Sequence, residues 1–161
     1  RQKLLRFLER YRAAGGLVAF DSNFRPQLWE SHKQALQSID DFWRACDIAL
    51  PSMDDERALF GAETTDETFQ RFASYGVTSG ALKRAGEGPQ LLYHTQPDEN
   101  FSSVARVVDT TAAGDSFNAG FLASLIAGHT EHHAAANGHA IASEVIQKKG
   151  AIVELPKKKW L

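Results

Sequence analysis

Several features that define large protein classes are scarce or absent in this sequence. Its 161 residues include one cysteine, Cys46, so no intrachain disulfide can form, which favours a reducing compartment and predicts a cytoplasmic protein. No run of roughly 18 apolar residues occurs, so we expect no membrane-spanning helix and no membrane partner. The formal net charge of -2 leaves no basic excess, and we expect no nucleic-acid partner.

Two common phosphate-binding fingerprints are missing as well. The sequence contains no G-x-x-x-x-G-K-[ST] segment, which excludes a P-loop protein. It also has no G-x-G-x-x-G segment after an apolar run, which excludes a dinucleotide-binding fingerprint. Any anion site must therefore be built in another way.

What is present is an alternation of helical and apolar segments in a chain of ordinary composition, 43% hydrophobic and 24% charged. This length fits one domain with one core. Hydrophobic spacing and Gly or Pro stops predict helices over residues 1–14, 29–46, 54–60, 66–75, 112–127 and 131–148. Short apolar runs predict strands at residues 17–20, 47–50, 80–83, 91–94, 104–108 and 151–153. The alternation predicts an α/β fold with a mainly parallel sheet covered on both faces.

Residues 109–115, D-T-T-A-A-G-D, lie between a predicted strand and a predicted helix. Small side chains let backbone N–H groups approach a ligand closely. The first turn of a helix adds unpaired N–H groups and the positive end of the helix dipole, which favour an anion. Asp115 then has two interpretations, a helix cap or a general base beside a phosphate. Spacing alone favours the cap.

The longer segment D-T-T-A-A-G-D-S-F-N-A-G-F, residues 109–121, resembles the C-terminal signature of PfkB (ribokinase-type) carbohydrate kinases, usually D-T-x-G-A-G-D. Ala112 replaces the first glycine, a form associated with the branch that acts on 2-keto-3-deoxygluconate. The resemblance implies that Asp115 is the catalytic base and contacts the substrate. It also implies that the amides of Ala112, Ala113 and Gly114, with that of Asp115, form an anion hole beside the nucleotide. The implied fold is a three-layer α/β/α ribokinase-like sandwich, and residues 1–161 would be its C-terminal, nucleotide-binding part.

Two segments support the same branch on the substrate side. Residues 21–29, D-S-N-F-R-P-Q-L-W, resemble its D-x-N-x-R-P-x-L-W stretch, which implies that Arg25 pairs with the sugar carboxylate and that Asn23 lies near the nucleotide phosphates. A guanidinium fork matches a carboxylate well. In P-S-M-D-D-E, residues 51–56, Ser52 and Asp55 replace the Asn and Glu of the family's N-x-x-E pattern. Asp55 is thereby a candidate Mg²⁺ ligand, and a helix cap with an acidic first turn is the equal alternative.

Two further segments resemble the nucleotide side of the family's site. In L-K-R-A-G-E-G, residues 82–88, Lys83, Gly86 and Gly88 would border the nucleotide. On the last long helix, Asn137 and Ala140 are candidates for the wall beside adenine. The small residues 134–136 are better explained by helix packing.

The resemblance implies ATP-dependent phosphorylation of 2-keto-3-deoxy-D-gluconate to its 6-phosphate, with ATP and Mg²⁺. The partners would be a sugar acid and ATP, and the full-length kinase could form a homo-oligomer. The alternatives are a fructokinase or ribokinase of the same family, or a non-catalytic nucleotide-binding fragment. The family's N-terminal half and lid are not among these residues. We therefore expect an open sheet edge, and no measurable kinase activity from residues 1–161 alone.

Overall fold

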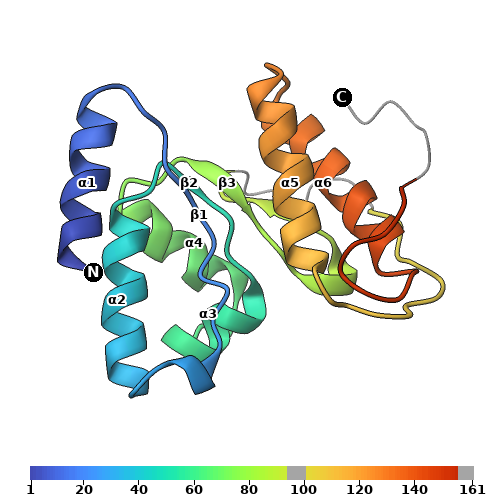
Figure 1. The fold of residues 1–161 in the computed structure, drawn as a ribbon, viewed down its shortest axis with the longest axis horizontal. Coiled ribbons are helices and arrows are strands. Elements are labelled where there is room, and N and C mark those ends of the chain that lie inside the picture. Colours follow the sequence, from blue (N-terminus) through green and yellow to red (C-terminus); the bar gives the residue numbers. More distant parts are fainter. Residues whose placement is uncertain (94–100, 156–161) are drawn as a thin grey trace. The chain divides into compact units, whose positions relative to one another are not determined.

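The computed structural model describes residues 1–93 and 101–155 (Figure 1). The chain divides into two compact units, Arg1–Leu82 and Lys83–Leu161. The end of the expected strand at residues 91–94, His94, lies outside the described residues. Within the described ranges, no helix has the length and apolar character needed to cross a membrane.

The first unit contains a parallel sheet in which β2 pairs with both β1 and β3. One α-helix, preceded by a short 3-10 helix, connects β1 to β2, and two α-helices connect β2 to β3. Because right-handed crossovers between successive neighbouring strands place their connections on the same face, these helices share one face of the sheet. The elements are α1 (Gln2–Ala13), β1 (Ala19–Phe20), η1 (Pro26–Leu28), α2 (His32–Arg44), β2 (Ile48–Ala49), α3 (Met53–Phe60), α4 (Thr65–Ser74) and β3 (Ser79–Leu82).

Aromatic side chains join these elements into a core. The Trp43 ring on α2 meets Phe20 of β1 edge-on at 4.6 Å and Phe72 of α4 at 4.9 Å. Trp43 is fully buried, and Phe72 is almost so. The strands also approach closely, since a Cβ on Gly80 would lie 1.8 Å from the carbonyl oxygen of Ala49. The parallel sheet predicted from the alternating segments is thus confirmed.

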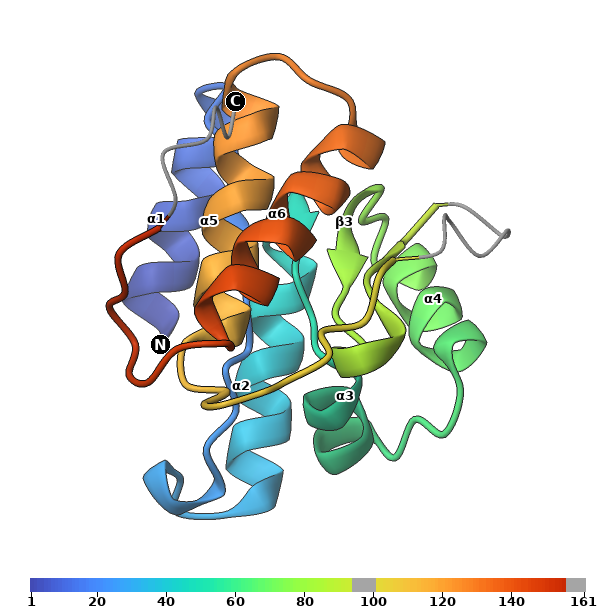
Figure 2. The ribbon, with the colours of Figure 1, turned by 90° about the vertical axis from the view of Figure 1, so that its right-hand side faces the viewer.

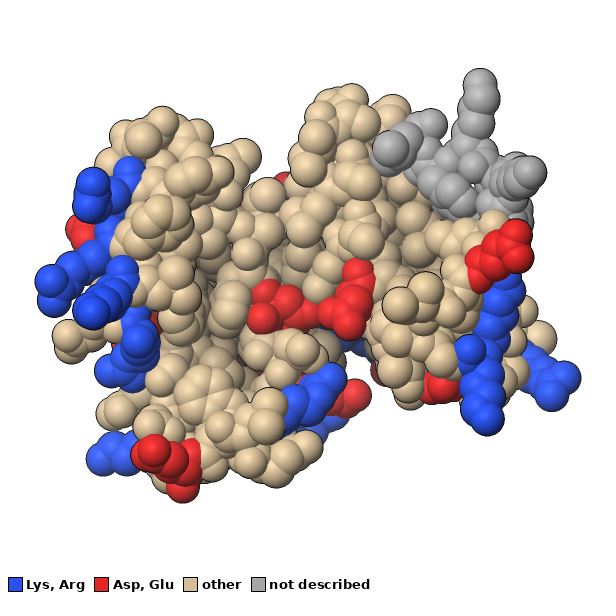
Figure 3. All heavy atoms as spheres, in the orientation of Figure 1, with Lys and Arg blue, Asp and Glu red and all other residues tan. Residues whose placement is uncertain are grey.

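Helix α1 lies at the surface of the first unit and contributes no buried residue. Figure 3 shows Lys and Arg side chains gathered over it. Two arginines contact the rest of the unit: Arg1, just before the helix, donates to Ser38 at 3.0 Å, and Arg12 near its end pairs with Asp47 at 2.8 Å. The helix is therefore attached mainly by polar contacts at its two ends.

The second unit is organised around two helices that lie side by side, α5 and α6 (Figure 2). Their backbones approach closely, because a Cβ on Gly120 would lie 2.8 Å from Gly138 Cα. Ala134 and Ala135 are buried, so their predicted role in helix packing is confirmed. The elements are η2 (Ala85–Glu87), β4 (Gln90–Leu91), α5 (Ala113–Ile126) and α6 (Glu131–Val145).

Two of the expected strands are wrong, and a third forms but is more exposed than expected. Residues 104–108 and 151–153 form no strand. Val108 is 46% exposed, and its N–H donates to Ile146 O beyond the end of α6 rather than to a sheet neighbour. A β-branched run forms a strand only where a neighbouring strand supplies hydrogen-bond partners and one side of the run can be buried. The surroundings of residues 104–108 therefore outweigh their strand propensity. Residues 17–20 were expected to be buried, whereas Ala19 in β1 is exposed.

Candidate active site

The start of α5 is not capped by a side chain. The helix begins at Ala113, Ala112 precedes it, and Asp115 is the third helical residue. The interpretation of Asp115 as the helix cap is therefore wrong. Its carboxylate is exposed in the first turn, where backbone N–H groups lack intrahelical acceptors and the dipole is positive.

The turn before α5 is held by Asp109. Its Oδ1 accepts from Thr111 N at 2.9 Å and from Thr111 Oγ1 at 2.6 Å, and its Oδ2 accepts from Gly150 N at 2.9 Å. These bonds, the Thr111 hydroxyl first, lower the pKa of Asp109 to about 2. The amide of Ala113, predicted to be part of the anion hole, donates to Thr110 O at 3.1 Å in this structure. The amides of Gly114 and Asp115 belong to the open first turn.

A lysine lies at the same helix start. Lys83 Nζ is 3.5 Å from where a Cβ of Gly114 would be, and it donates to Asn118 Oδ1 at 3.2 Å. A positive side chain beside the positive end of a helix favours an anion. The structure thus places Lys83 beside Gly114 and the first turn that contains Asp115, and the role of these residues at a bound phosphate stays a prediction. Asn118 was missed from sequence, although its i, i+3 spacing from Asp115 places it on the same helix face.

Ala112, where the family usually has glycine, adopts a left-handed conformation with φ 61° and ψ 16°. This conformation costs a non-glycine residue about 1–2 kcal/mol. Glycine relieves that strain but loses more backbone freedom on folding, which costs about 0.4–1 kcal/mol. We expect Ala112→Gly to raise the free energy of unfolding by about 0.5–1 kcal/mol in urea denaturation.

The matched control is Ala113→Gly, one residue later and inside the helix. Glycine there should lower the free energy of unfolding by about 0.5–1 kcal/mol, since no strain is relieved. Equal destabilisation by both substitutions would contradict a left-handed Ala112.

The other residues of the second unit that were predicted to contact the nucleotide differ in their exposure and in their contacts. Gly88 is buried with φ 80°, and a Cβ there would meet Phe101 at 2.7 Å, whereas Gly86 in η2 is exposed. Asn137 donates from Nδ2 to Ser124 Oγ at 2.9 Å, inside the α5–α6 pair. Ala140 is exposed. The contacts of Gly88 and Asn137 are thus structural, and their predicted role at the nucleotide stays a prediction.

In the first unit, the loop after β1 presents Arg25, predicted to bind the substrate, and Asn23, predicted to lie near the nucleotide phosphates. Asn23 and Arg25 are both exposed, on either side of the buried Phe24. Asn23 has φ 39°, and its N–H donates to Asp21 Oδ1 at 3.1 Å. Arg25 Nη1 donates to Phe24 O at 2.9 Å, which leaves further guanidinium donors for a ligand.

Ser52 and Asp55 lie at the start of α3 and contact each other. Ser52 Oγ accepts from Asp55 N at 3.2 Å. The helix cap, one of the two interpretations of residues 51–56, is therefore confirmed. Asp55 Oδ2 accepts from Ser22 Oγ at 2.8 Å and from Phe24 N at 2.9 Å. Over the described residues, no group of three or more His, Cys, Asp or Glu could hold a metal. The role of Asp55 as an Mg²⁺ ligand stays a prediction.

The parallel sheet of the first unit, and in the second unit a lysine beside an open helix start, are features expected of an α/β protein that binds phosphate groups. Residues 1–158 match the family described as "pfkB family carbohydrate kinase". The chain belongs to this family, as the segment at residues 109–121 predicted.

Known relatives agree with this assignment. The chain is 39% identical over 157 residues to a 2-dehydro-3-deoxygluconokinase of Escherichia coli, covering 95% of this chain and 51% of the relative. It is 39% identical over 159 residues to the enzyme of the same name from Dickeya dadantii, covering 96% and 51%. The chain thus spans about half the length of these curated relatives.

Solved structures extend the likeness to the fold. Aminoimidazole riboside kinase from Salmonella enterica, complexed with aminoimidazole riboside and an ATP analog, matches with a TM-score of 0.79 and 28% identity. The match covers 94% of this chain and 53% of that one. The α/β, ribokinase-like fold class expected from the sequence is confirmed.

Proposed function

We propose that residues 1–161 form the nucleotide-binding part of a kinase that transfers a phosphoryl group from ATP to 2-dehydro-3-deoxygluconate. This is the compound called 2-keto-3-deoxygluconate above, and the product would be its 6-phosphate. The observation that carries the proposal is the start of α5, where Asp115 and Lys83 accompany open amides. The identity to 2-dehydro-3-deoxygluconokinases supports the choice of substrate.

Asp115 would take the proton from the acceptor hydroxyl as that oxygen attacks the phosphoryl group. The amides of the first turn, those of Gly114 and Asp115 with Ala112 and Ala113, would stabilise charge on the transferring group. Lys83 Nζ would add a positive charge at the same place. Asn118, which accepts from Lys83 Nζ, would hold the ammonium group toward the helix start.

Arg25 would pair with the substrate carboxylate, and Asn23 would lie toward the phosphates. Gly86, Gly88, Asn137 and Ala140 would border the nucleotide. Mg²⁺ would arrive with ATP, held by phosphate oxygens and water and by few protein carboxylates, the usual state of this ion in phosphoryl-transfer sites. Asp55 was the candidate that the sequence offered for such a ligand, and the ion would neutralise charge on the phosphates.

Two alternative functions differ from this proposal, one in the substrate and the other in the absence of phosphoryl transfer. A fructokinase or ribokinase would act on a neutral sugar and give Arg25 no carboxylate to bind. A non-catalytic fragment would bind ATP without transfer. Coupled ADP-release assays on the full-length kinase that contains these residues, with ATP and 2-dehydro-3-deoxygluconate, fructose or ribose, separate the three. Turnover with fructose or ribose but not with the acid would refute the proposed substrate.

Replacement of Arg25 should affect the acid alone. Arg25→Ala removes one charge-assisted pair, and we expect binding of 2-dehydro-3-deoxygluconate to weaken by about 2–3 kcal/mol while use of a neutral sugar hardly changes. The measurement is KM for each sugar, with isothermal titration for the acid. Arg57→Ala is the control, since Arg57 is exposed and paired only loosely, at 3.5 Å, with Asp54. Equal losses for acidic and neutral sugars would indicate a structural role for Arg25.

A further inference from the structure

One carboxylate oxygen anchors the loop that carries Arg25 at two points. Ser22 Oγ donates to Asp55 Oδ2 at 2.8 Å, and Phe24 N donates to the same atom at 2.9 Å. The two donors flank Asn23, so both sides of that residue are tied to α3. A side chain from one element therefore sets the backbone path of another.

The conformation between the anchors is narrowly defined. Asn23 has φ 39°, in the left-handed region that few residues other than glycine and asparagine adopt readily. Phe24 is 6% exposed and meets the His32 ring edge-on at 6.5 Å. His32 Nε2 in turn donates to Ala58 O at 3.0 Å, which ties the start of α2 to α3. Because Phe24 points into the core, Asn23 and Arg25 on either side of it are exposed to solvent.

We infer that Asp55 is a positioning residue for the substrate loop. Through Ser22 and the Phe24 amide, it fixes the direction in which Arg25 meets the substrate and Asn23 meets the nucleotide phosphates. A guanidinium–carboxylate pair depends on planar geometry, so a loop displaced by about 1 Å loses much of it. The inference rests on the proposed function, and it assigns Asp55 a role through protein contacts rather than through metal.

Two substitutions separate these roles. Ser22→Ala removes one anchor and leaves the Asp55 carboxylate intact for any metal. Asp55→Asn removes the charge from both anchors. Asp54→Asn is the matched control, because it makes the same change one residue away on a side chain that is 87% exposed.

In the full-length kinase, we expect Ser22→Ala and Asp55→Asn each to raise KM for 2-dehydro-3-deoxygluconate about tenfold, the effect of one lost hydrogen bond to a charged group. The kcat value and the Mg²⁺ concentration for half-maximal activity should change little, and Asp54→Asn should behave as the wild type. An unchanged KM in Ser22→Ala, together with a raised Mg²⁺ requirement in Asp55→Asn, would overturn the inference in favour of a metal ligand.

A second measurement does not depend on catalysis. Amide hydrogen exchange at Phe24, followed by NMR, should be at least about tenfold faster in both variants than in the wild type or Asp54→Asn, because the Phe24 N–H loses its charged acceptor or the loop loosens. If the protein does not phosphorylate the sugar acid, the proposed function fails, and exchange at Phe24 still decides the role of Asp55. Wild-type exchange in Asp55→Asn would refute that role.

Discussion

In the full-length kinase, Asp115→Asn should lower the rate of phosphoryl transfer by about two to four orders of magnitude, the contribution of a general base. Asparagine keeps the shape of the side chain but cannot accept the hydroxyl proton. ATP binding should change little, because the carboxylate would meet the acceptor hydroxyl rather than the nucleotide. Removing a negative charge from a helix start should, if anything, favour an incoming phosphate. The measurements are single-turnover transfer of the phosphoryl group and ATP affinity by titration.

The control for Asp115→Asn is Glu131→Gln, which removes the acidic side chain from the first turn of α6. It makes a comparable charge change at the start of the other helix of the second unit, and we expect transfer to stay near the wild-type rate. Wild-type turnover in Asp115→Asn would exclude Asp115 as the base. A parallel loss in both variants would point to helix stability instead of proton transfer.

Local sequence signals were sufficient to predict the α-helices and the local structure of the motifs at residues 51–56 and 109–115. The helix predicted over residues 54–60 with a glycine stop is α3, and Gly61 after it adopts φ 69°. The cap at its start, one of two interpretations of residues 51–56, is made by Ser52. The turn before α5 was predicted from residues 109–115. Each of these features depends on residues close together in the sequence, where turn and capping chemistry is visible.

Partners that are distant in the sequence could not be predicted in the same way. The run at residues 104–108 has strand composition, and only its surroundings decide that Val108 bonds to Ile146 instead. The motif at residues 51–56 offered Asp55 as an Mg²⁺ ligand or as part of a helix start. Its hydrogen bonds to Ser22 and Phe24 depend instead on how α3 lies against the loop after β1. No spacing rule predicts such pairs, because they are set by packing.

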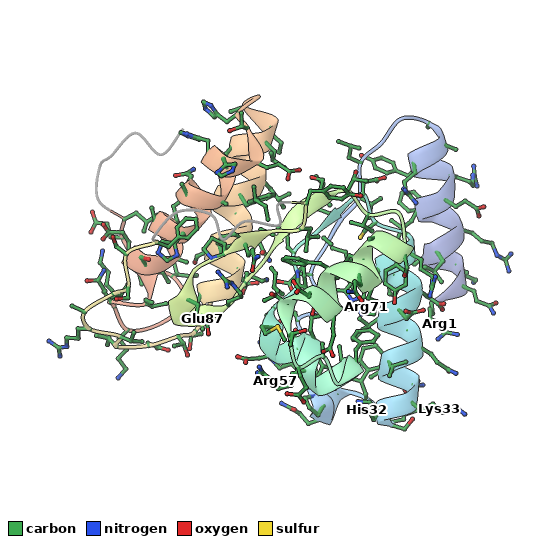
Figure 4. The ribbon with its side chains drawn as sticks, turned by 180° about the vertical axis from the view of Figure 1, so that it is seen from behind. Arg1, His32, Lys33, Arg57, Arg71 and Glu87 are labelled. Carbon is green, nitrogen blue, oxygen red and sulfur yellow. The ribbon has the colours of Figure 1, made fainter. Side chains whose placement is uncertain are left out.

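The buried ion pair between Glu56 of α3 and Arg71 of α4 is the most important contact that was not predicted from the sequence. Glu56 is fully buried, and the Arg71 side chain is 17% exposed. Figure 4 labels Arg71 on α4. Its guanidinium lies 3.7 Å from the centre of the Phe60 ring, and burial lowers its pKa. Its Nη1 donates to the Tyr75 hydroxyl at 3.3 Å, so the pair belongs to a polar network among the helices.

Glu56→Leu should lower the free energy of unfolding by about 3–5 kcal/mol, a large part of the stability of a domain. The cost arises because the buried guanidinium loses its counter-charge while the volume of the side chain is nearly kept. Urea denaturation followed by circular dichroism measures it. Asp54→Leu, in an exposed pair with Arg57 at 3.5 Å, is the control and should change stability by about 0–1 kcal/mol.

The double variant Glu56→Leu/Arg71→Met tests the cause of this loss. Replacing both charges with apolar side chains of similar volume removes the unpaired charge, so most of the stability lost in Glu56→Leu should return. Arg71→Met alone should be about as damaging as Glu56→Leu, because it leaves a buried carboxylate without its partner. If the losses in the two single variants simply add in the double variant, the side chains do not act as a pair, and cavities or lost ring contacts of Arg71 would explain the destabilisation.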